Sequence, residues 1–197
     1  MNNAKSFGTR NLVLLALLTA IVVVLQFLGA FIKFGPFSIS LVLLPITIGA
    51  ALIGVYAGLW LGLVFGFVVL ISGDAGPFLA VNVYATILVV LLKGALAGLV
   101  SGVAYKLLGA RNKTAAATVA AVFCPIVNTG IFVIGCYVFF LPTIAAWGVA
   151  EGALSTAAYI FIGMIGANFL IEFGINLILS PVIVRLIQYG QDKRVTA

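Results

Sequence analysis

The sequence contains no histidine, only four acidic residues and only two cysteines. Histidine is the commonest general base and metal ligand, so its absence argues against both kinds of site. The acids form no pair at helical spacing, no glycine-rich loop has the phosphate-binding pattern, and no serine stands in a nucleophile signature. We therefore expect no enzyme, no cofactor and no metal. Cys124 and Cys136 fall in one predicted helix, about 18 Å apart along its axis, and cannot form a disulfide with each other.

Charge is scarce as well, with 7% charged residues against 64% hydrophobic ones and a mean hydropathy of +1.35. This composition is typical of integral membrane proteins. The apolar runs have helical length and do not alternate in polarity, which excludes an outer-membrane β-barrel. The net charge of +6 comes from Lys and Arg at predicted helix ends, so we expect no nucleic-acid partner. The sequence predicts an all-α integral membrane protein in the lipid bilayer, with residues 1–197 forming a single domain.

The apolar runs predict six transmembrane helices in one compact bundle, over residues 11–32, 39–53, 56–71, 82–108, 114–140 and 157–188. The run from 38 to 71 is too long for one ordinary crossing, and we expect it to fold into two helices at Gly54–Gly58. The first of these two helices is short and contains Pro45, which predicts a bent or partly re-entrant segment. Residues 72–77 are expected to be a loop, and 141–156 the longest loop.

Six crossings place both termini on one side of the membrane, and the charges predict which side. One side holds Lys5, Arg10, Lys106, Arg111, Lys113, Arg185, Lys193 and Arg194, together with Asp192. The other holds Lys33, Asp74 and Glu151. The positive-inside rule makes the first side cytoplasmic, so both termini are predicted to be cytoplasmic.

Two polar stripes interrupt the apolar helices. Asn82, Thr86 and Lys93 lie at offsets of four and seven, and so on about the same side of the helix at 82–108. Asn82 is also a plausible N-cap for that helix. The helix at 157–188 carries a comparable stripe, Asn168, Glu172 and Asn176. We predict that the two stripes face each other and help to hold a polar solute.

The charges in these stripes allow two interpretations. A charge inside the membrane costs at least about 2.5–3.5 kcal/mol on insertion scales, so it needs a partner or a function. Lys93 and Glu172 either pair with each other, or one or both of them contact a charged solute. Asn128 follows Pro125, which is expected to kink its helix, and it either hydrogen-bonds a neighbouring helix or contacts the ligand.

Small residues repeat every four positions at three places. Gly54, Gly58, Gly62 and Gly66 form a ridge that suits close helix packing, as do Gly94 and Gly98. Ala16 and Ala20 form a small-xxx-small pair in the first helix. The alanine pattern alone favours packing within the chain.

The whole chain resembles a substrate-capture subunit (S component) of the energy-coupling factor (ECF) transporters, which import vitamins into bacteria. The resemblance rests on the size, the six helices, the alanine pair Ala16 and Ala20, the short turn at 33–38, the Gly/Pro-rich loop at 72–77 and the basic turn after the fourth helix. The stretches Leu41-Val-Leu-Leu-Pro-Ile, Leu70-Ile-Ser-Gly-Asp-Ala, Leu91-Leu-Lys-Gly-Ala-Leu-Ala-Gly and Cys124-Pro-Ile-Val-Asn-Thr-Gly-Ile-Phe resemble, more narrowly, a branch associated with pantothenate uptake.

The resemblance implies a transport subunit of the bacterial plasma membrane that binds a vitamin from outside. It implies partners as well: a transmembrane coupling subunit (T component) and two ATPase subunits, with Ala16 and Ala20 as docking residues. The loops that carry Lys33, Phe34, Asp74 and Trp147 would gate a pocket lined by Asn82, Thr86, Lys93, Asn128, Asn168 and Glu172. The whole bundle is expected to topple in the membrane and so carry the solute inward.

Other functions remain open from the residues. A different vitamin (folate, riboflavin or niacin) is an alternative substrate. A gradient-driven carrier or small channel would use Lys93 and Glu172 as a relay, although no internal repeat of the kind such carriers have is visible. A membrane-embedded enzyme or a purely structural assembly partner is a further alternative, and the lack of catalytic residues argues against the enzyme.

Overall fold

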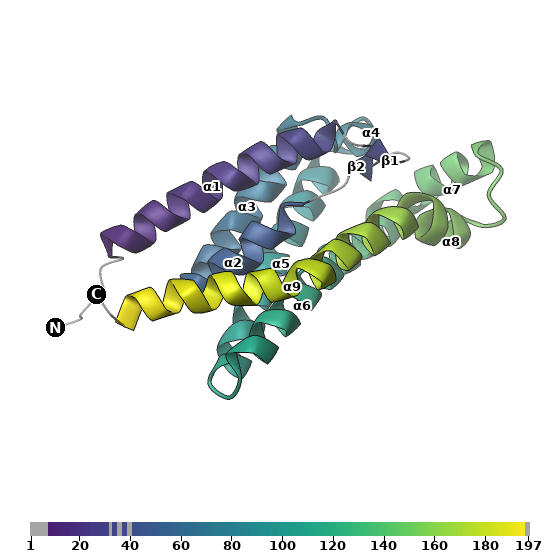
Figure 1. Cartoon of the computed structure of the whole chain (residues 1–197). Helices are drawn as coiled ribbons and strands as arrows, with labels where there is room; N and C mark the ends of the chain where they lie inside the picture. Colours follow the sequence, from purple (N-terminus) through teal and green to yellow (C-terminus); the bar gives the residue numbers. More distant parts are fainter. Residues whose placement is uncertain (1–7, 32, 35–36, 39–40, 196–197) are drawn as a thin grey trace.

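The computed structural model of the chain describes residues 8–31, 33–34, 37–38 and 41–195, and most of that backbone is helical (Figure 1). The side chains of residues 33–34, 37–38, 167–168, 180, 183, 186–188 and 190–195 lie outside the description. The predicted all-α class is confirmed. The one departure among the described residues is a short hairpin in which β1 (Lys33–Phe34) pairs antiparallel with β2 (Phe37–Ser38).

The helices follow the apolar runs of the sequence. They are α1 (Thr9–Ala30), α2 (Leu43–Leu52), α3 (Val55–Ile71), α4 (Gly76–Leu79), α5 (Val83–Gly109), α6 (Lys113–Gly135), the π-helical turn η1 (Cys136–Phe140), α7 (Leu141–Ala150), α8 (Thr156–Ala158), the π-helical turn η2 (Tyr159–Met164) and α9 (Gly166–Val195). The run from 38 to 71 breaks at Gly54, within the expected stretch, where φ is +135° and a side chain would be strained.

The stretch at 141–156 is not the loop that the sequence predicts. Helix α7 occupies Leu141–Ala150 and continues α6 through η1, so the helical stretch runs over Lys113–Ala150. Pro142 does not stop it, because the backbone of Phe140 (φ −125°, ψ 3°) departs from the helical conformation and Pro142 lies in the first turn that follows, where its missing N–H is not needed. The loop is confined to the turn around Gly152, whose φ is +71°. The expected loop at 72–77 likewise contains the start of α4.

The two predicted glycine ridges pack against each other and hold α3 directly on α5. A Cβ added at Gly62 would collide with the Gly94 carbonyl oxygen, and one at Gly58 would collide with that of Gly98. The backbones therefore approach more closely than any larger residue would permit. The α3–α5 pair forms one wall of the bundle. It positions Lys93, which directly precedes Gly94 on α5 and lines the cavity described below.

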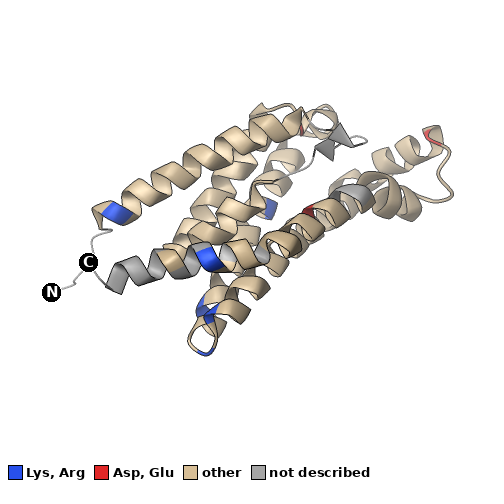
Figure 2. Cartoon of the chain, in the orientation of Figure 1, with Lys and Arg blue, Asp and Glu red and all other residues tan. Residues whose placement is uncertain are grey.

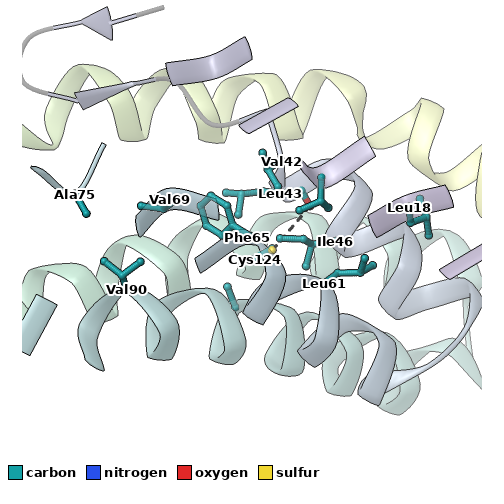
Figure 3. Close-up of a cluster of buried hydrophobic side chains, with 12 residues drawn as sticks. Leu18, Val42, Leu43, Ile46, Leu61, Phe65, Val69, Ala75, Val90 and Cys124 are labelled. Carbon is teal, nitrogen blue, oxygen red and sulfur yellow. Dashed lines mark hydrogen bonds between the residues drawn. The ribbon is translucent and has the colours of Figure 1, made fainter. Parts of the chain in front are cut away.

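The largest described hydrophobic cluster lies between α1, α2, α3 and α5. Figure 3 shows Leu18, Val42, Leu43, Ile46, Leu61 and Phe65 together, with Cys124 beside them. Helix α2 is almost entirely buried in the bundle, and its ten residues span only about 15 Å. Pro45 is the third residue of α2 and lies in its first turn, and the helix is too short to cross a bilayer alone.

Four described helical stretches are long and apolar enough to cross a membrane: Thr9–Ala30, Val83–Gly109, Lys113–Ala150 and Thr156–Leu179. Helices α2 and α3 are apolar and shorter, so six crossings stay a prediction. The start of α1, the α5–α6 turn and the end of α9 lie at one end of the molecule, and the hairpin, α4 and α7 lie at the other (Figure 1). Most of the coloured Lys and Arg positions gather at the first end (Figure 2).

Candidate solute-binding site

A cavity lies between α1, α3, α5, α6 and α9, toward the end of the molecule that carries α4. Its space for the centres of water-sized molecules is about 100 Å³, whereas one water needs about 10–15 Å³. Five phenylalanines and other apolar side chains form most of the wall. The polar lining residues are Gln26, Asp74, Thr86, Lys93, Asn128, Thr129 and Glu172. An apolar wall with a few convergent polar groups is the usual form of a small-molecule site.

Lys93 from α5 and Glu172 from α9 face this same cavity, as the two polar stripes predict. The Lys93 ammonium lies over the rings of Phe65 and Phe132, at 5.5 and 5.4 Å from their centroids. It interacts electrostatically with Glu172 and with Asp74. Among the described residues, however, Lys93 Nζ has no hydrogen-bond acceptor and no carboxylate within 4.0 Å. The three N–H donors of this ammonium are therefore not satisfied by direct ion pairing within the described chain.

Asn128 lies on α6 one turn before Phe132, so the two side chains point to the same face of that helix. Its side chain is only 6% exposed and lines the cavity. The Oδ1 atom is enclosed and has no hydrogen-bond partner. Enclosed polar atoms are nearly always satisfied in folded proteins, so this unsatisfied oxygen is unusual, but it is not itself open to the cavity.

The other stripe residues divide between cavity and structure. Thr86 lines the cavity and donates its hydroxyl to the Asn82 carbonyl oxygen at 2.7 Å. Asn82 is exposed and lies outside the lining, because its side chain accepts from Ala85 N at 3.0 Å and caps α5. Its predicted capping role is thus confirmed. On α9, Asn176 is buried outside the lining and donates to the Glu172 carbonyl oxygen at 2.8 Å. The Asn168 side chain lies outside the described residues.

Gln26 is a cavity residue that the sequence analysis did not single out. It lies on the inner face of α1, is 2% exposed, and donates from Nε2 to the Asp74 carboxylate. This bond joins α1 to the segment between α3 and α4, so Asp74 is part of the cavity wall as well as of a loop. The signal was present in the sequence: Gln26 is a strongly polar residue inside the apolar run at 11–32, and such residues in membrane helices usually face the bundle interior.

The remaining predicted residues lie around the cavity. Trp147 of α7 contacts Phe78 edge to face, with 5.6 Å between centroids, and Phe78 is part of the cavity wall. Trp147 itself lines a second pocket on the outer side of Phe78. The hairpin contains Lys33 and Phe34, whose side chains are not described. Ala16 and Ala20 are exposed on α1, about 80° and 120° around the helix axis from Gln26.

Comparisons with known proteins agree with this architecture. The family model described as "ECF transporter, substrate-specific component" matches residues 10–184. Among solved structures, the ThiT protein of Listeria monocytogenes superposes with a TM-score of 0.62 at 21% identity, covering 90% of this chain and 96% of that chain. At this identity the likeness shows the fold alone. No curated protein sequence matches the chain. Because the family model spans most of the sequence, the chain belongs to the family of substrate-specific components of ECF transporters.

Proposed function

We propose that this chain captures a vitamin from outside the cell in the cavity described above and delivers it inward as the substrate-specific subunit of an ATP-driven ECF importer. Pantothenate is the proposed vitamin. Members of the family are transport subunits, and the hydrolysis of ATP belongs to separate partner subunits. Residues Thr86, Lys93, Asn128 and Glu172 are proposed to contact the solute, together with Asn168, while Asn82 supports them by capping α5.

The ammonium of Lys93, which has no carboxylate within 4.0 Å among the described residues, carries the proposal. An ammonium inside a membrane helix is costly unless an anion or water meets it. The described residues around it offer two aromatic rings and two carboxylates beyond direct contact. A carboxylate on the solute would supply the missing acceptor, and pantothenate carries one. Its hydroxyl and amide groups match the remaining polar lining, including Asp74 and Glu172.

The orientation and partners follow from the charge distribution and the family. We propose that the basic end, with both termini, is cytoplasmic, because Lys and Arg concentrate on that side of membrane proteins (Figure 2). The cavity then lies toward the outside, and the segments carrying Lys33, Phe34, Asp74 and Trp147 gate it. A T component docks on Ala16 and Ala20, two ATPase subunits drive the complex, and the whole bundle topples to carry the solute inward.

A gradient-driven carrier is the second candidate, because Lys93 and Glu172 line one cavity and interact electrostatically. Uptake assays in cells separate the two functions. Uptake of labelled pantothenate that requires co-expressed coupling and ATPase subunits supports the importer. Uptake by this chain alone, abolished by a protonophore, would establish the carrier instead.

Identification of the solute begins with mass spectrometry of small molecules that co-purify with the protein in detergent.

The two cysteines then report on the cavity. Cys136 lines it, whereas Cys124 is buried in the core and lies outside the lining. A small thiol reagent should modify Cys136 more slowly when pantothenate is bound, with Cys124 as the internal control. Equal modification with and without pantothenate, over a range of concentrations, would contradict binding in this cavity.

A further inference from the structure

The α5–α6 boundary of the cavity brings a second polar group next to Lys93. The Lys93 ammonium lies 5.4 Å from the Phe132 ring centroid. Asn128 precedes Phe132 by one helical turn, which puts their Cβ atoms about 5–6 Å apart on the same face of α6. Lys93 and Asn128 therefore line neighbouring parts of the same wall, although they come from different helices.

The Asn128 amide is oriented with its oxygen toward the protein. Oδ1 is enclosed without a hydrogen-bond partner, so it is not the atom that a solute reaches first. The Nδ2 group donates no hydrogen bond to a described residue and is not among the enclosed atoms. Since the residue lines the cavity, Nδ2 is the polar end open to it. Two N–H donor groups, one charged and one neutral, thus border one part of the cavity.

We propose that Asn128 and Lys93 together form the subsite for the carboxylate of the solute, with Asn128 as a specificity-determining residue. This inference rests on the proposed function and deepens it. A carboxylate has two oxygens, so Lys93 Nζ can bind one while Asn128 Nδ2 donates to the other. A neutral alcohol in the same place would leave the ammonium without an anion, which makes the pair selective for the acid over its alcohol analogue.

The apolar surroundings strengthen this selectivity. The rings of Phe65 and Phe132 lie 5.5 and 5.4 Å from the Lys93 ammonium and cover part of its surface with apolar atoms, and Cys136 extends the apolar wall one turn beyond Phe132. Charge-assisted hydrogen bonds are stronger where water is excluded, and a missing partner is correspondingly more costly. The carboxylate end of the solute would therefore lie at the α5–α6 boundary, with its hydroxyl donors directed toward the acceptors Glu172 and Asp74.

The test compares pantothenate with pantothenol, in which CH₂OH replaces the carboxylate. Purified full-length protein in detergent is titrated with each compound by calorimetry. We expect the wild type to prefer pantothenate, and Asn128→Leu to lose about 10- to 100-fold in affinity for pantothenate, the usual effect of removing a hydrogen bond to a charged group. Affinity for pantothenol should change much less. Lys93→Met should reduce the same preference, and the double variant should lose less than the sum of the two, because both residues contact one carboxylate.

Two further variants complete the design. Asn128→Asp replaces the donor by an acceptor of the same shape and should reverse the preference toward pantothenol. Asn176→Leu is the matched control, since Asn176 also has an enclosed, unpartnered Oδ1 but lies outside the cavity lining; it should retain the wild-type preference.

Each outcome supports or overturns a specific step. Full preference for pantothenate in Asn128→Leu, or in Asn128→Asp, would overturn the role of Asn128 while leaving the proposed function intact. Equal affinity of the wild type for the two compounds would overturn the carboxylate subsite itself. If the wild type bound neither compound, the proposed substrate would be overturned together with this inference.

Discussion

At the scale of single residues, the charges of the described cavity lining are unequal in number: the Lys93 ammonium faces two carboxylates, Asp74 and Glu172. A buried cluster of this kind is stabilised by a bound solute only where its charges complement the solute. Asp74 already accepts a hydrogen bond from Gln26. Glu172 interacts electrostatically with Lys93 and lies on α9, so neutralising it tests the charge of the solute from another helix.

We predict that Glu172→Gln raises the affinity for pantothenate by severalfold. The substitution keeps the shape of the side chain and removes a negative charge that competes with the solute carboxylate for Lys93. Calorimetric titration measures this change, with pantothenol as the neutral control. The importer should retain ATP-dependent uptake in this variant. A loss of uptake with unchanged binding would instead favour Glu172 as part of an ion relay.

At the scale of helices, the contact between α3 and α5 determines where Lys93 lies. We predict that Gly62→Ala lowers the thermal unfolding midpoint of the detergent-solubilised protein by several degrees and weakens solute binding. The new methyl group meets the backbone of Gly94, so the two helices have to separate. Gly130→Ala is the matched control, since nothing lies within 4 Å of its Cβ and alanine favours the helix. Equal unfolding midpoints for the two variants would show that the α3–α5 contact can relax.

The helices also show what the sequence could and could not predict. The length of the apolar runs and the four-residue spacing of the glycines predicted the fold class. The cost of placing Lys93 and Glu172 inside the membrane, together with their positions in the polar stripes, predicted the shared cavity. The helix at Leu141–Ala150 was missed because Pro, Gly and Trp composition suggests a loop, whereas the position of Pro142 in the first turn is compatible with a helix. The Gln26–Asp74 bond could not be predicted, because it joins residues 48 positions apart through tertiary packing.

At the scale of the whole molecule, the exposed face of α1 carries the two alanines that we propose as docking residues. Ala16 and Ala20 are exposed there, among the large exposed side chains Leu12, Leu17, Ile21, Val24 and Phe27. Small residues among larger ones make a shallow depression along a helix, which allows another helix to approach closely. The cavity residue on this helix, Gln26, is buried and lies about 80° from Ala16 and 120° from Ala20 around the helix axis, so we expect changes at the alanines to leave the solute contacts in place.

We therefore predict that Ala16→Phe combined with Ala20→Phe abolishes ATP-dependent uptake in cells that express the coupling and ATPase subunits, because interfaces between helices tolerate bulk poorly. The affinity of the purified chain for solute should stay within about twofold of the wild type, because substitutions at exposed sites are nearly neutral. Co-purification of the T component should be lost as well. The matched control is Ala146→Phe, which adds the same bulk to an exposed alanine of α7, far from α1 (Figure 1). Normal uptake in the double variant would place the docking surface on another helix, whereas loss of solute binding would mean that the exposed face of α1 and the cavity are not independent.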